Sequence, residues 1–183
     1  YQRDFVWLVN AGVALKTDIV TEPKSPLLKT ARPSQFKLYQ SDTGMLMARY
    51  PAGVAQAAYL DSKEPNLGGV YENVVAQQLA AQGRELYYYQ TKRRGEVDFV
   101  VDGADGAAVP IEVKSGAYYH AHAALDHVVE TAEYGVRRGI VFSRGNVEKD
   151  DKVLYLPIYA IYALPDILGD GQANGLRLTT VTV

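Results

Sequence analysis

The spacing of apolar residues changes along the chain, and each spacing predicts a different element. In about the first dozen residues they recur every three or four positions, which predicts a helix. Residues 14–20 then predict a strand, the proline-rich segment 21–35 a loop, and residues 36–42 a returning strand. Asp42 is placed to cap a helix over 43–50. Helix, strand, loop and strand in this order form the back half of a winged helix, or equally a small helix-plus-hairpin unit with no role on DNA.

From residue 70 to residue 158, helical spacing alternates with the period-two spacing of strands. The predicted order is helix, three strands, helix and two strands. The helices cover 70–83 and 121–135, and the strands cover 85–91, 96–101, 108–114, 138–143 and 152–157. Residues 51–69 predict an irregular linker. Residues 158–164 predict either a short helix or a continued strand, cut by Pro165, and the tail ends in a strand-prone run.

Composition restricts the class of protein without identifying it. A chain of 183 residues that is 48% hydrophobic can bury a sizeable core. It has no apolar run of about 18 residues and no visible signal peptide, so no membrane span is predicted. The lack of cysteine excludes disulfides, thiolate metal sites and cysteine nucleophiles, and it fits a cytoplasmic location. Residues 1–50 hold seven Lys and Arg against four Asp and Glu, and residues 51–183 hold twelve against seventeen, which hints at different roles for the two parts.

Two neighbouring predicted strands carry charged side chains in a pattern suited to a metal site. Because side chains alternate across a strand, Asp98 in the first, and Glu112 and Lys114 in the second, point away from the apolar faces. Those faces consist of Val97, Phe99 and Val101 and of Val109, Ile111 and Val113. Two carboxylates at close range repel each other, and a divalent cation such as Mg²⁺ relieves that repulsion. With an ammonium group beside it, such a cation is the apparatus for phosphodiester hydrolysis.

These residues resemble the motif of the PD-(D/E)xK nuclease superfamily. The spelling GEVDFVV…IEVKSG is similar to archaeal Holliday-junction resolvases and Mrr-like restriction nucleases. It is closer still to the domain of unknown function that ends many bacterial and archaeal AAA-type ATPases. That family also shows a K-x-Y-x-x-D-x-G segment, a Glu-Asn pair on a helix and a Tyr-Tyr strand, which correspond here to Lys37, Tyr39, Asp42 and Gly44, to Glu72 and Asn73, and to Tyr88 and Tyr89. The resemblance covers roughly residues 35–158.

The resemblance implies a fold and a domain organisation. It implies an α/β domain of restriction-endonuclease type, a mixed sheet flanked by helices, over residues 67–168. A partial winged-helix-like subdomain and linker at 1–66 would precede it. A tail at 169–183, which could contain one further strand, would follow. A P-loop ATPase module is implied upstream. Neither a P-loop nor a Walker B segment occurs in this chain, so it has no ATP site of its own.

The resemblance also implies roles for individual residues. Asp98 and Glu112 would bind Mg²⁺ or Mn²⁺, with the backbone carbonyl of Val113 as a third ligand. Lys114 would be the catalytic lysine, and Glu72 would reach the site from its helix as an auxiliary acid. The substrate would be DNA.

Other readings of these residues stay open. The acids and the lysine also fit a solvated hairpin face with a surface salt bridge worth about 0–1 kcal/mol. The fold can instead serve as a non-catalytic module that binds DNA or a protein, or as an oligomerisation domain. The basic turn at 92–94 fits phosphate contacts or an ordinary charged turn. The aromatic runs 87–89 and 118–119 favour half-buried packing over base stacking. The three histidines, His120, His122 and His127, are predicted to be solvated.

Overall fold

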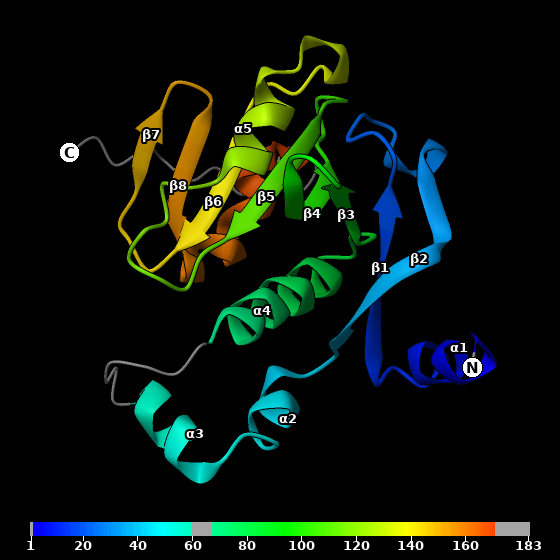
Figure 1. Cartoon of the computed structure of the whole chain (residues 1–183), viewed down its shortest axis with the longest axis vertical. Coiled ribbons are helices and arrows are strands. Elements are labelled where there is room, and N and C mark those ends of the chain that lie inside the picture. The colour runs from blue at the N-terminus through cyan, green and yellow to red at the C-terminus, as the bar shows by residue number, and fades with distance from the viewer. Residues whose placement is uncertain (1, 60–66, 171–183) are drawn as a thin grey trace.

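The computed structural model describes residues 2–59 and 67–170 (Figure 1). Their strands form one eight-stranded mixed sheet in the order β2-β1-β3-β4-β5-β6-β8-β7. The strands are β1 (Ala14–Val20), β2 (Ala31–Gln40), β3 (Tyr87–Thr91), β4 (Gly95–Asp102), β5 (Ala108–Val113), β6 (Gly139–Ser143), β7 (Glu148–Asp150) and β8 (Val153–Pro157). The helices are α1 (Gln2–Asn10), α2 (Thr43–Met47), α3 (Ala52–Tyr59), α4 (Gly68–Ala81), α5 (Ala123–Glu130) and α6 (Leu164–Leu168), with short 3₁₀ turns η1 (Leu27–Lys29), η2 (Ala132–Tyr134) and η3 (Ile158–Ala163).

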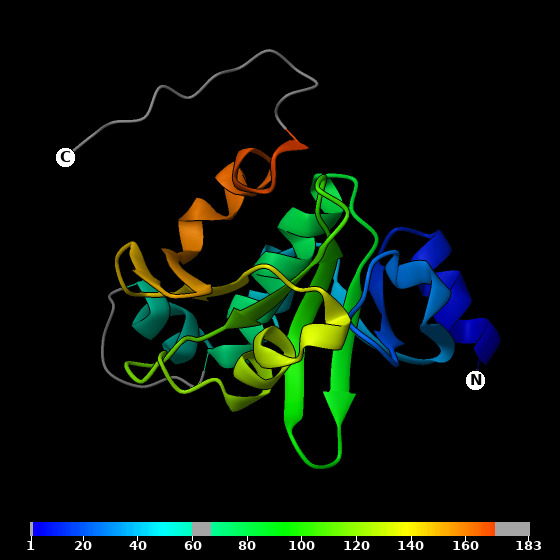
Figure 2. The same cartoon turned by 90° about the horizontal axis from the view of Figure 1, so that it is seen from above.

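Helices cover both faces of the sheet, and a separate apolar cluster fills the space on each side (Figure 2). On one face, α5 packs its buried residues against β3, β4 and β6. On the other, α4, η3 and α6 pack against β4, β5, β6 and β8. The predicted α/β class, a mixed sheet flanked by helices, is therefore confirmed. No helix within the described ranges has the length and apolar character needed to cross a membrane.

The N-terminal hairpin joins the same sheet as the rest of the chain. Strand β1 pairs antiparallel with β2 and parallel with β3, where Asp18 lies opposite Tyr87. The strand predicted at 14–20 is confirmed. The expected loop is shorter than predicted, because β2 begins at Ala31 and pairs with β1 across a register shift.

Two predictions about secondary structure were wrong, and one strand was not predicted. Residues 52–59 form α3 rather than irregular linker, because this alanine-rich run has high helix propensity. The short helix that was one of two alternatives for 158–164 is confirmed by η3, but Pro165 does not end the helical run, since it occupies the first turn of α6, where its missing N–H costs nothing. Strand β7 escaped prediction because its Glu-Lys-Asp sequence is fully exposed and has no apolar alternation. The extra strand expected in the tail falls beyond residue 170, outside the described residues.

Candidate functional site

Strand β4 contains a β-bulge at the position of Asp98. Tyr87 lies opposite Val100, but Tyr89 lies opposite Val97, so two residues of β4 face one residue of β3. Val97 therefore packs in the cluster on the α5 face, whereas Phe99 packs on the α4 face. The prediction that Val97 and Phe99 share a face was wrong, because it assumed unbroken alternation through residue 98.

Asp98 lies where the pairing of β4 with β5 stops. The ladder runs from Asp102 opposite Ala108 to Phe99 opposite Ile111. One residue further on, the backbone N–H of Val113 donates to Asp98 Oδ2 at 2.7 Å instead of to a backbone carbonyl. Asp98 is only 9% exposed. Its carboxylate thus lies between β4 and β5 at the point where the two strands separate, next to the end of β5. We call this point, with Asp98, Glu112 and Lys114, the fork.

Glu112 lies on the neighbouring strand, with one satisfied and one unsatisfied oxygen. Lys114 Nζ is 2.7 Å from Glu112 Oε1. Glu112 Oε2 is buried and has no hydrogen-bond partner among the described residues. Val109, Ile111 and Val113 all pack in the cluster on the α4 face, so the predicted alternation along β5 is confirmed. An unpaired buried carboxylate oxygen is costly, and a ligand that it can bind would offset that cost.

The environment of the fork disfavours negative charge. Burial, followed by the charges of Glu112 and Glu72, raises the pKa of Asp98 to about 8. Burial also raises the pKa of Glu112, while the adjacent Lys114 opposes that rise. Carboxyl groups whose pKa values are raised for these reasons are frequent at functional sites.

Glu72 on α4 lies near enough to the fork for its charge to act on the carboxyl groups of Asp98 and Glu112. The Tyr39 hydroxyl on β2 donates to Glu72 Oε2 at 3.1 Å, and its ring lies 5.4 Å from that of Phe99. Burial and the charges of Glu72 and Asp98 raise the pKa of Tyr39 well above its usual range. Tyr39 therefore keeps its proton and holds the Glu72 carboxylate in place.

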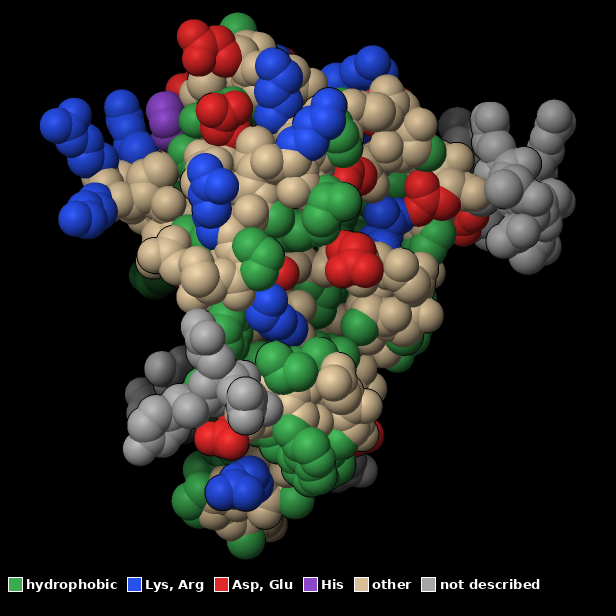
Figure 3. All heavy atoms as spheres, turned by 90° about the vertical axis from the view of Figure 1, so that its right-hand side faces the viewer, with side chains coloured by type: hydrophobic (Ala, Val, Ile, Leu, Met, Phe, Trp, Pro, Cys, Tyr) green, Lys and Arg blue, Asp and Glu red, His purple; other side chains and the backbone are tan. Residues whose placement is uncertain are grey.

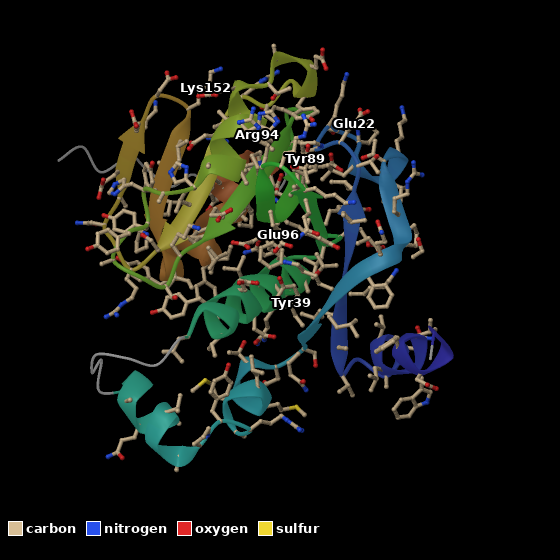
Figure 4. The ribbon with its side chains drawn as sticks, in the orientation of Figure 1. Glu22, Tyr39, Tyr89, Arg94, Glu96 and Lys152 are labelled. Atoms are coloured by element: carbon tan, nitrogen blue, oxygen red, sulfur yellow. The ribbon has the colours of Figure 1, made fainter. Side chains whose placement is uncertain are left out.

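Two further charged residues belong to this neighbourhood, and sequence reasoning gave neither a role. Lys37 on β2 forms an ion pair with Glu96 on β4, and its Nζ lies 4.9 Å from the ring centroid of Tyr88. Figure 4 places Glu96 and Tyr39 on the α4 side of the sheet. The available signal was the Lys-x-Tyr spacing, which puts Lys37 and Tyr39 on one face of a strand.

A buried amide on α4 holds β2 beside the site. Asn73, which is 2% exposed, accepts from the N–H of Gln40 at 2.8 Å and donates to its carbonyl at 3.0 Å.

Asp42 caps α2 by accepting from the Met45 N–H at 2.7 Å, which confirms the predicted cap. A Cβ at Gly44 would lie 2.9 Å from Asp42 Oδ1, so glycine leaves room for the cap.

The aromatic and histidine predictions had mixed outcomes. The run 87–89 is buried in β3, so packing is confirmed there. His122 is not solvated: it is 7% exposed and its Nε2 lies 2.7 Å from the Tyr155 hydroxyl. His120 remains exposed, within 3.0 Å of Glu148. The error for His122 arose because its position before α5 turns the ring inward against β8.

The fork supplies carboxylates for a cation but no dense cluster of side-chain ligands. In the part of the chain that the structure describes, no group of three or more His, Asp or Glu side chains is arranged to hold a metal ion. Asp98 and Glu112 would need a backbone carbonyl or water to complete a coordination shell. Mg²⁺ accepts such a shell, because it keeps several waters and binds one or two carboxylates.

Among known families, a model described as a domain of unknown function, DUF4143, matches residues 67–161 of the chain. The matched segment contains α4, the fork and the strands up to β8, but it excludes Lys37 and Tyr39. No curated protein and no solved structure matches the chain. Since the matched segment covers more than half of the 183 residues, the chain belongs to the DUF4143 family.

Proposed function

We propose that the fork is a nuclease-like site that hydrolyses phosphodiester bonds of DNA with Mg²⁺ or Mn²⁺. The observation that carries the proposal is the pair of buried carboxylates at the end of a strand ladder, beside a lysine. Asp98 and Glu112 are both less than 10% exposed, and Glu112 keeps one buried oxygen without a partner among the described residues. A solvated surface salt bridge, the simpler alternative, does not account for this burial.

The residues of the fork fit a hard divalent cation. Asp98, the free oxygen of Glu112 and the Val113 carbonyl would hold the ion, which when bound would polarise the phosphate and a water. Lys114, now paired with Glu112, would orient the attacking water or stabilise charge on the phosphorane. Glu72 would act as the auxiliary acid, with Tyr39 fixing its position. The water oxygen would form the new bond to phosphorus as the bond to the leaving sugar oxygen breaks.

The wider identity of the chain belongs to the same proposal. Its motifs support a restriction-endonuclease-like fold for 67–168, a partial winged helix before it, and attachment to an upstream AAA-type ATPase module in the cytoplasm. The mixed sheet flanked by helices supports this reading at the level of fold class. Fold class alone does not supply an activity, so the proposal depends on the fork.

A second candidate is a non-catalytic module with the same fold, which would bind DNA or a protein and regulate the ATPase. The observation in its favour is that one oxygen of each of these two carboxyl groups is already engaged within the chain. Asp98 Oδ2 accepts from the Val113 N–H, and Glu112 Oε1 contacts Lys114. These contacts stabilise the fork without a cation.

Nicking of supercoiled plasmid in Mg²⁺ or Mn²⁺ separates the two candidates. Catalysis predicts cleavage that Asp98→Asn and Lys114→Met each abolish, while Lys149→Met, at an exposed site on β7, leaves it unchanged. Calorimetry on the same proteins would measure cation binding. If the wild-type chain binds neither cation, catalysis is excluded and the binding module is the better account.

A further inference from the structure

The turn between β3 and β4 concentrates positive charge at one exposed point. Lys92, Arg93 and Arg94 are consecutive, and all three are exposed. No described carboxylate forms an ion pair with any of them. We call these three residues the basic tip. Its charge stands out in a chain whose formal net charge is −2.

Local contacts hold the basic tip in a defined conformation. The N–H of Arg94 donates to Thr91 Oγ1 at 3.1 Å, and Gly95 adopts a φ of 90° to close the turn. A Cβ at Gly95 would lie 3.9 Å from Ala124 Cβ at the start of α5, so the turn rests against that helix. A tip ordered in this way loses little conformational entropy on binding.

The basic tip projects past the fork at the same end of the sheet. Pairing of β4 with β5 stops at Phe99, whereas pairing of β4 with β3 continues to Thr91 opposite Gly95. Figure 2 shows the hairpin extending beyond its neighbours, and Figure 3 shows Lys and Arg side chains that stand out at the corresponding left edge. From Gly95 to Asp98 the strand spans about 10 Å, at roughly 3.3 Å per residue.

We infer that the basic tip binds the sugar–phosphate backbone of DNA and fixes its position relative to the fork. The inference rests on the proposed function, because the fork defines where the reacting phosphate would lie. Phosphates of one strand advance about 3.4 Å along the duplex axis, so about 10 Å corresponds to about three phosphates. Contacts of this kind place the nucleic acid and carry no direct sequence information. The tip thus supplies affinity, and the fork supplies chemistry.

The test measures binding of a fluorescently labelled DNA duplex by fluorescence anisotropy. EDTA is present throughout, so that no hydrolysis occurs. The variant K92Q/R93Q/R94Q should bind at least about tenfold more weakly at low salt. Its plot of log affinity against log salt should be shallower by about 2, because two or three phosphate contacts are lost. The matched control R32Q/R49Q/K149Q also removes one Lys and two Arg, all exposed, and should bind like wild type.

Two results would overturn the inference. One is equal loss of affinity in the tip variant and the matched control, which would mean that only net charge matters. The other is tip-dependent binding of polyglutamate as tight as that of DNA. Asp98→Asn keeps the two proposals distinguishable: if wild type and this variant bind DNA equally and wild type never nicks plasmid, hydrolysis fails while the role of the basic tip stands.

Discussion

The raised pKa of Asp98 predicts a specific dependence of stability on pH. In the unfolded chain Asp98 has its ordinary pKa of 3.8, whereas in the folded protein the pKa is about 8. A group whose folded pKa is raised contributes stability that is fully present below its unfolded pKa and is lost as pH rises through the folded one. Asp98 therefore destabilises the fold progressively between about pH 4 and pH 8.

Asp98→Asn isolates this contribution. The amide resembles the protonated acid in shape, and its oxygen can still accept from the Val113 N–H, but it does not ionise. The unfolding free energy of the variant minus that of wild type should rise by about 1.4 kcal/mol per pH unit, or about 4 kcal/mol from pH 5 to pH 8, and level off above pH 8. Because Asp98 is nearly fully buried, little of this is lost to solvent screening.

Urea unfolding followed by circular dichroism at pH 5, 6, 7, 8 and 9 measures the difference directly. Asp105→Asn provides an exposed control on the β4–β5 turn, and its difference from wild type should stay within about 0.5 kcal/mol at each pH. A difference for Asp98→Asn that stays flat between pH 5 and pH 8 would refute the reasoning. The fork would then be better solvated than its burial indicates.

Three further substitutions test how the N-terminal hairpin supports the site. Tyr39→Phe removes the hydrogen bond to the Glu72 carboxylate but keeps the ring. It should therefore lower the unfolding free energy by about 1 kcal/mol in urea titrations. Asn73→Ala leaves the backbone of Gln40 without its two hydrogen-bond partners and should cost about 2–4 kcal/mol in the same assay. An effect below about 1 kcal/mol would mean that these two hydrogen bonds do not hold β2 to α4. Gly44→Ala should displace Asp42 from its cap, so it should leave the protein about 1 kcal/mol less stable than Gly53→Ala does, a helix position where a Cβ meets nothing within 4 Å.

Much of the fold followed from the sequence because periodicity reports burial. The central strands and helix α4 have strong apolar spacing and lie where predicted, and α5 lies inside the predicted range 121–135 but ends at Glu130. The failures have local causes. Strand β7 has no apolar residues. The bulge at Asp98 inserts one extra residue into β4, and this reverses the face on which the preceding side chains lie, which an alternation rule cannot detect.

The candidate site was predictable only in part. Alternation along β5 places Glu112 and Lys114 together, and the structure shows that contact. The neighbours of Glu72 depend on tertiary pairing, since Tyr39 lies 33 residues away in sequence. The basic tip was visible as three consecutive cations, but its projection past the fork depends on where the two ladders end.

The parallel pairing of β1 with β3 constrains how this chain folds as the ribosome makes it. Asp18 can pair only after Tyr87 has been synthesised, so the hairpin of β1 and β2 leaves the ribosome long before its partner strand β3. During that interval the free edge of β1 offers unpaired backbone groups to other nascent chains. Contacts between such distant segments also slow folding, because a long loop must close first. Truncations that end before residue 87 are therefore expected to aggregate, even though they contain a complete hairpin.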